Sequence, residues 1–200
     1  FQPKSILDSI AQHKATILPL VPTIYSFLVQ LYARGGYDVS SLRYCISGGA
    51  SLPETLLKRV EEGLGVTVIE GYGLTETSPV IAVNTMEDGS VPGSVGPVLP
   101  NIELEIVDDS GKSLKQGEVG EIRVRGETVM RGYWNKPDET AETISAEGWL
   151  RTGDLGHMDE NGRLYISAGR KKDLIIRAGE NVSPLAIENA LMNHPAIAEV

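Results

Sequence analysis

Glycine, hydroxyl and charged side chains gather in the stretch Glu70–Thr77, which follows an apolar run typical of a buried strand. Such a stretch emerges at the carboxyl end of a sheet, where α/β proteins bind ligands. The ring of Tyr72 could stack on a base, Thr75 could donate to a phosphate, and Glu76 could hold Mg²⁺. The alternative is a plain strand-to-helix connection in which Thr75 or Thr77 caps the helix.

A second stretch, Gly148–Gly156, places Asp154 between glycines and predicts a tight loop. An aspartate in such a loop can accept hydrogen bonds from two adjacent ribose hydroxyls, as acidic residues do in dinucleotide sites. Taken alone, Asp154 would instead be a turn former.

A third stretch, centred on Gly169–Asp173, is basic. Residues 163–177 hold five basic residues and one acid, a local charge of +4 in a chain of formal charge −9. Such a run could form the wall of a phosphate site. A solvated surface run is the alternative.

Two regions of the chain, with different hydrophobic patterns, must position these stretches. Residues 4–71 alternate helical and extended patterns, which predicts a parallel or mixed sheet with helices packed on it. Ser51 and Glu54 predict a capping box at the start of one of those helices. From residue 101 to about 168 the pattern changes to period-2 alternation, which predicts a small β-rich unit. Ser183 and Pro184 predict the start of a final helix.

Composition excludes several classes of protein. An acidic chain without a basic face is a poor nucleic-acid binder. A single cysteine, Cys45, permits no internal disulfide, and three scattered histidines lack metal-ligand spacing. The longest apolar stretch is interrupted well short of the run of about eighteen residues that a membrane span needs, so we expect no transmembrane segment. No signal peptide precedes it, which favours a cytoplasmic location.

Both ends of the sequence are expected to be cut. It begins at Phe1 without an initiating methionine, and it stops at Ala198-Glu199-Val200, where an apolar run is beginning. We therefore expect an internal segment of a longer chain.

The three stretches in this order resemble the adenylate-forming superfamily, which includes acyl-CoA synthetases, aryl-CoA ligases, luciferases and peptide-synthetase adenylation domains. The matching residues are Gly71–Thr77, Arg151–Asp154 and Gly169–Asp173. The resemblance runs through all 200 residues. Within the superfamily the chain most resembles bacterial long-chain fatty-acid–CoA ligases, on the segments Pro22–Tyr25, Ser47–Ala50 and Leu174–Asn181.

The resemblance implies a nucleotide site. It assigns the adenine and acyl pocket to Gly48, Gly49 and Ala50, with Tyr72 stacking on the base and Gly73 in the same binding motif. It further implies that Asp154 holds the ribose hydroxyls and that Arg170 reaches the ribose and phosphate.

The resemblance also implies the residues of the reaction. Thr75 would contact the α-phosphate, and Glu76 would ligate the magnesium. Lys172 occupies the hinge position about which a second domain rotates between two half-reactions. Gly179 matches the glycine beside which pantetheine passes. The family's phosphate loop would lie upstream of Phe1 and its adenylating lysine downstream of Val200, so the isolated chain is expected to be inactive.

The expected fold is α/β: part of the large N-terminal domain, with α/β layers and a small β-barrel-like unit, and the start of a C-terminal α+β domain. The expected segments are 1–100, the α/β part of the adenylate-binding domain, 101–171, the β-rich subdomain, and 172–200, the hinge and beginning of the C-terminal domain.

The implied activity is the ligation of a fatty acid to coenzyme A through acyl-AMP, with ATP, Mg²⁺ and coenzyme A bound. Peripheral membrane contact stays open. The alternatives are a domain that adenylates amino acids or aryl acids, and a nucleotide-binding scaffold without turnover. The segment from Tyr44 to Ala50 offers no evident polar residue for a substrate amino group, which disfavours the amino-acid reading.

Overall fold

The computed structural model describes residues 2–177, 180–192, 194, 196 and 197, and it divides the chain into two compact units. The first unit runs to Gly71 and also takes in Asn84–Gly93. The second takes Tyr72–Val83 and the chain from Ser94 onward. The predicted segment 1–100 is therefore shared between both units.

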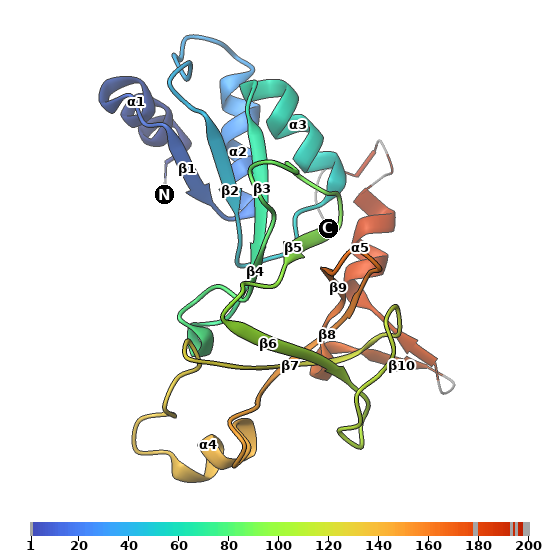
Figure 1. Ribbon diagram of the computed structural model, residues 1–200. Coiled ribbons are helices and arrows are strands. Elements are labelled where there is room, and N and C mark those ends of the chain that lie inside the picture. Colours follow the sequence, from blue (N-terminus) through green and yellow to red (C-terminus); the bar gives the residue numbers. More distant parts are fainter. Residues whose placement is uncertain (1, 178–179, 193, 195, 198–200) are drawn as a thin grey trace. The chain divides into compact units, whose positions relative to one another are not determined.

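The first unit pairs parallel strands with helices, as the alternating pattern predicted (Figure 1). Its elements are α1 (Pro3–His13), β1 (Ile17–Leu20), α2 (Pro22–Tyr32), β2 (Tyr44–Ser47), α3 (Glu54–Leu64) and β3 (Thr67–Tyr72), the last ending on the first residue of the second unit. Strand β2 is central, with β1 and β3 parallel to it on either side. Tyr25 of α2 is fully buried, and its hydroxyl lies within hydrogen-bond distance of the carbonyl oxygens of Leu18 and Ile46, which ties the helix to two strands.

The predicted capping box at the start of α3 is wrong. Pro53 occupies the N-cap position without a side-chain hydrogen bond, and Glu54 instead pairs with Lys58 at 2.7 Å. In the chain just before the helix, the backbone N–H of Leu52 donates to the buried carboxylate of Glu70, at 3.0 Å. A distant strand residue therefore anchors the segment that the local motif was expected to hold.

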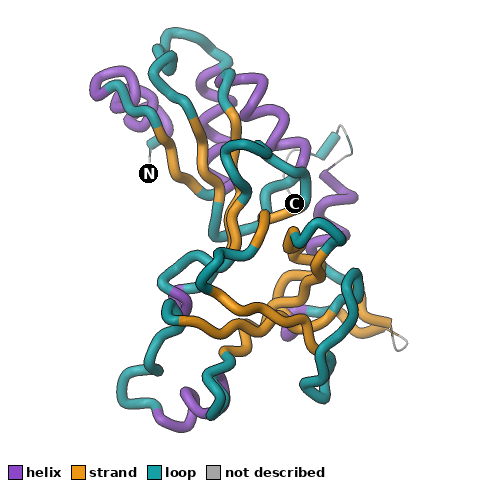
Figure 2. Tube along the Cα trace, in the orientation of Figure 1, coloured by secondary structure: helices purple, strands orange, loops and turns teal. Residues whose placement is uncertain are grey.

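The second unit is built on an antiparallel sheet of five strands in the order β5-β9-β8-β7-β6, which confirms the predicted β-rich unit. Figure 2 draws its strands in orange. The strands are β5 (Ser94–Pro97), β6 (Ile102–Val107), β7 (Gly120–Gly126), β8 (Leu150–Met158) and β9 (Arg163–Arg170). Strands β5 and β6 are its edges, so the sheet is open within the described residues. Ile122, Leu150 and Leu164 are fully buried at its centre.

Strand β4 (Ala82–Val83) follows β3 in the sheet of order β1-β2-β3-β4, and β10 (Ile175–Arg177) and β11 (Glu180–Val182) form a separate two-stranded sheet. The other elements are η1 (Thr75–Thr77), α4 (Pro137–Thr143), η2 (Lys171–Asp173) and α5 (Pro184–Met192). The predicted final helix is confirmed, and the backbone N–H of Ala186 donates to the Ser183 hydroxyl at 3.2 Å. None of the described helices is long and apolar enough to cross a membrane. The domain boundary at residue 172 stays a prediction.

The structure corrects the predicted loop around Asp154. This residue lies inside strand β8, paired with Arg170 of β9, and not in a connection. Gly153 has φ +74°, and the register of the two strands shifts between Leu155 and Gly156. Gly153 and Gly156 therefore accommodate irregularities within a long strand, because glycine tolerates such backbone geometry, while Gly148 lies in the bend that precedes the strand.

Candidate active site

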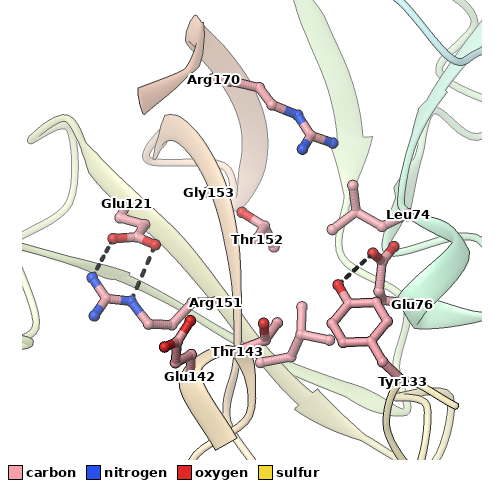
Figure 3. Close-up of a pocket in the computed structure, with 11 residues that line it drawn as sticks. Leu74, Glu76, Glu121, Tyr133, Glu142, Thr143, Arg151, Thr152, Gly153 and Arg170 are labelled. Atoms are coloured by element: carbon pink, nitrogen blue, oxygen red, sulfur yellow. Dashed lines mark hydrogen bonds and ion pairs between the residues drawn. The ribbon is translucent and has the colours of Figure 1, made fainter. Parts of the chain in front are cut away.

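A polar pocket of about 330 Å³ lies wholly within the second unit, and residues of β7, β8 and β9 contribute to its lining (Figure 3). Its charged lining consists of Glu76, Glu121, Glu142, Arg151 and Arg170. Leu74, Tyr133, Thr143, Leu150, Thr152 and Gly153 complete it. Two of the residues predicted from sequence, Glu76 and Arg170, therefore face the same cavity.

Glu76 reaches the pocket from the short helix η1 that follows β3. The preceding Gly73 is required there, because a Cβ at this position would lie 1.7 Å from the carbonyl oxygen of Pro79. Thr77 is fully buried; its hydroxyl accepts from the backbone N–H of Leu74 at 3.1 Å and lies within hydrogen-bond distance of two nearby carbonyls. Thr77 therefore takes part in the cap of η1, as the alternative reading of this stretch expected, while the side chain of Glu76 lines the pocket.

The carboxylate of Glu76 is held by a residue that sequence reasoning missed. The hydroxyl of Tyr133 donates to Oε1 of Glu76 at 2.8 Å (Figure 3). This bond, and to a lesser degree burial, raise the pKa of Tyr133, so the phenol stays protonated and donates. No periodic pattern surrounds Tyr133 in the sequence. The only local signal is the preceding Gly132.

Asp154 forms a second cluster with the other predicted residues of this unit. It is 6% exposed, and its Oδ2 accepts a hydrogen bond of 2.6 Å from the Tyr72 hydroxyl. Its Oδ1 lies 3.6 Å from Nε of Arg170. Burial raises the pKa of Asp154, and Tyr72 and Arg170 offset part of that effect. Neither Tyr72 nor Asp154 lines the pocket itself; Arg170 belongs both to this cluster and to the pocket lining.

Two basic residues near the pocket, Arg151 of β8 and Lys171 of the basic run, are paired with acids. Arg151 makes a two-pronged contact with Glu121, with Nε 3.1 Å from Oε1. Nζ of Lys171 lies 2.6 Å from Asp109 and 3.5 Å from Glu121. Burial opposes the ionisation of Glu121, but its basic neighbours outweigh burial and its pKa lies below the ordinary value. Part of the positive charge expected for a phosphate wall is therefore engaged in structural pairs.

The remaining predicted residues are placed as follows. Thr75 lies exposed on η1, and Lys172 lies exposed on η2. Gly48, Gly49 and Ala50 belong to the first unit, where they follow the carboxyl end of β2. Gly49 has φ +80°, a conformation that favours glycine. Gly179 lies outside the described residues.

These residues fit a nucleotide that brings its own metal. Mg²⁺ is usually bound through one or two carboxylates together with substrate phosphates. Glu76 supplies such a carboxylate, and the described residues contain no group of three side chains that could cage a metal by themselves. Arg170 adds a cation at the same cavity, and Asp154 offers acceptors for hydroxyl groups beside it.

Comparison with known proteins gives this site a family. Residues 1–134 match the family described as AMP-binding enzyme. The long-chain-fatty-acid–CoA ligase of Bacillus subtilis (strain 168) is 44% identical over the whole chain, which covers 36% of that protein. The indoleacetate–CoA ligase of Aromatoleum aromaticum is 40% identical over the whole chain, which covers 39% of it.

A solved structure of an enzyme in this family has the same fold as this chain. The ATP-bound structure of MatB from Rhodopseudomonas palustris matches with a TM-score of 0.90 and 38% identity, over the whole of this chain and 39% of that one. The chain thus spans between a third and two fifths of the length of these relatives. A match over two thirds of the sequence, on a fold shared with an ATP-bound relative, places this chain in the AMP-binding, adenylate-forming family of enzymes.

Proposed function

We propose that the protein containing this chain is a fatty-acid–CoA ligase. It activates a long-chain fatty acid with ATP, forming acyl-AMP and pyrophosphate, and then passes the acyl group to the thiol of coenzyme A with release of AMP. The family membership supports the adenylation chemistry. The long-chain substrate is supported by the 44% identity to a ligase of that name and is the finer part of the proposal.

The reaction requires the negative charge around the α-phosphorus of ATP to be neutralised. A carboxylate is a weak nucleophile, and it must approach a phosphorus surrounded by negative oxygens. In our proposal Arg170 provides positive charge at the phosphate, and Glu76 holds the Mg²⁺ that accompanies ATP and supplies Lewis-acid stabilisation. Thr75 contacts the α-phosphate. Asp154 fixes the ribose, so that the α-phosphorus is aligned for attack.

One observation carries this assignment: Tyr72, Asp154 and Arg170 form a single contact cluster although they come from β3, β8 and β9. A buried carboxylate between a phenol and a guanidinium is costly to maintain unless its interactions compensate. Binding a ribose beside a phosphate is a function that would account for keeping this carboxylate buried. The roles of Gly48, Gly49, Ala50 and Gly179, and of Lys172 as a hinge, stay predictions.

Acid-dependent exchange of labelled pyrophosphate into ATP tests the proposal. The full-length protein is assayed with Mg²⁺ and a panel of palmitate, indoleacetate and a mixture of amino acids. We expect the fastest exchange with palmitate. We further expect Asp154→Asn to weaken ATP binding about tenfold, since a charged hydrogen-bond acceptor is lost. Asp138→Asn, which changes an exposed aspartate of α4, is the matched control.

Each outcome has a distinct meaning. Faster exchange with indoleacetate or amino acids would replace the fatty-acid assignment with an aryl-acid or amino-acid one and keep the adenylation. Nucleotide binding without exchange for any acid would favour the non-catalytic scaffold.

A further inference from the structure

Glu76 is contacted twice by one loop of the second unit. The backbone N–H of Met130 donates to the carbonyl oxygen of Glu76 at 2.8 Å, and the Tyr133 hydroxyl donates to its side chain at the same distance. The loop lies between β7 and α4, more than fifty residues along the chain. Both the backbone and the carboxylate of Glu76 are therefore fixed by the same segment.

Tyr133 is itself anchored at its backbone. Its N–H donates to Oγ1 of Thr140 in α4 at 2.9 Å, and that hydroxyl in turn donates to the carbonyl of Lys136 at 2.7 Å. Gly132 makes this approach feasible, because its φ is +146° and a Cβ there would lie 2.7 Å from Cγ2 of Thr140. The phenol is thus held at one end by α4 and at the other by Glu76.

The hydrogen bond occupies only one oxygen of the carboxylate. Tyr133 donates to Oε1, and no described residue donates to Oε2. A hydrogen bond to a charged acceptor is stronger than one between neutral groups and restricts the rotation of the side chain. A carboxylate so restrained presents its second oxygen to the cavity in one orientation, which a metal ligand requires.

We propose that Tyr133 is a positioning residue for Glu76 as a metal ligand: it orients the carboxylate so that Oε2 receives the divalent cation that arrives with ATP. The inference rests on the metal role that the proposed function gives to Glu76. It adds that high affinity for the cation requires the loop from Gly126 to α4 to hold Tyr133 against Glu76.

Binding of Mn²⁺ tests this without turnover. Free and bound Mn²⁺ are measured by electron paramagnetic resonance on the full-length protein saturated with a non-hydrolysable α,β-methylene analogue of ATP. Tyr133→Phe removes only the hydroxyl and is expected to raise the Kd for Mn²⁺ by about three- to tenfold, in the range of one hydrogen bond to a charged group. Tyr165→Phe is the matched control, because its hydroxyl lies 3.4 Å from a carboxylate oxygen of Asp159, which does not line the pocket.

Glu76→Gln and the double variant complete the cycle. Glu76→Gln is expected to raise the Kd further than Tyr133→Phe does, and Tyr133→Phe is expected to add nothing in the Glu76→Gln background, because the two act through one ligand. The Kd of the nucleotide analogue without metal and the midpoint of thermal unfolding are measured alongside. A merely structural role for Tyr133 would change those two quantities and not the metal affinity alone.

The outcomes of this experiment distinguish a failure of the Tyr133 proposal from a failure of the metal role of Glu76. If Glu76→Gln leaves the Kd for Mn²⁺ unchanged, the metal role of Glu76 is wrong. If Glu76→Gln weakens binding while Tyr133→Phe does not, or weakens it equally in both backgrounds, Tyr133 is not a positioning residue and the proposed function stands. If Tyr133→Phe does not fold, Thr140→Ala, which releases the backbone of Tyr133, takes its place and is expected to weaken binding in the same direction.

Discussion

The hydroxyl of Tyr72 lies 2.6 Å from Oδ2 of Asp154, although 82 residues separate them in the sequence. The contact joins the end of β3 to the middle of β8. Burial and the nearby Asp154 raise the pKa of Tyr72, so the phenol is the donor and the carboxylate the acceptor. The pair therefore makes the ionisation of Asp154 depend on Tyr72.

Removing that hydroxyl should make nucleotide binding sensitive to pH. Burial already raises the pKa of Asp154, and Tyr72→Phe takes away a bond that opposes this rise. Asp154 in the variant should hold its proton to higher pH, and a protonated carboxyl is a poorer acceptor for two ribose hydroxyls. We expect the Kd of AMP, measured by calorimetry, to be higher in Tyr72→Phe than in the parent protein, and this difference to be larger at pH 5.5 than at pH 8. A loss of equal size at both values would mean that Tyr72 acts only by packing.

Glu70 should make the protein less stable at alkaline pH. Its carboxyl is 7% exposed, and burial raises its pKa to about 7 from 4.5, with the N–H of Leu52 opposing the shift. A raised pKa means that the protonated form favours folding, so this contribution is complete below pH 4.5 and is lost as pH rises through 7. The difference of roughly 2.5 pKa units corresponds to about 3 kcal/mol.

Glu70→Gln keeps an acceptor for Leu52 and carries no charge to bury. We expect it to match the parent near pH 4.5 and to unfold at higher urea concentration than the parent at pH 8. Glu62→Gln, at an exposed position of α3, serves as the control for losing one negative charge. A stability difference that does not grow with pH would show that Glu70 is not buried as a carboxyl in the folded protein.

Gly73 and Gly63 should respond to alanine in opposite directions. A Cβ on Gly73 would meet the Pro79 carbonyl at 1.7 Å, so the turn that carries Glu76 must shift. Gly63 lies in α3 with open space around it, and alanine there favours the helix by roughly 0.5–1 kcal/mol. Urea unfolding should therefore show Gly73→Ala destabilised by a few kcal/mol and Gly63→Ala mildly stabilised. A neutral Gly73→Ala would contradict the close approach.

The sequence predicted the elements better than it predicted the side-chain partners. The parallel strands of the first unit could be predicted because each is a short apolar run bounded by turn residues. The placement of Asp154 was wrong because glycine serves bulges within a strand as well as loops, and only the pairing with Arg170 distinguishes the two. Tyr133 could not be found, since its partner lies 57 residues away and its contact depends on a loop without periodicity.

Lys172→Pro tests the predicted hinge. Lys172 is exposed within the single turn η2, so its side chain is not needed for packing. Proline fixes φ near −65° and should hold one rotational state of the following segment, separating the two half-reactions. We expect single-turnover formation of acyl-AMP and formation of acyl-CoA from added acyl-AMP to change by different factors, at least tenfold apart, as a hinge role predicts. Equal retention of both would remove the hinge role from Lys172.

The central claim is that a carboxylic acid is activated as its adenylate. The most direct measurement is a single-turnover reaction of the full-length protein with radiolabelled palmitate, ATP and Mg²⁺ but no coenzyme A, quenched in acid and resolved by chromatography. We predict one equivalent of palmitoyl-AMP with stoichiometric pyrophosphate, and its conversion to palmitoyl-CoA and AMP when coenzyme A is added. Formation of ADP and phosphate in place of AMP and pyrophosphate, or the absence of any adenylate while ATP is bound, would contradict the account.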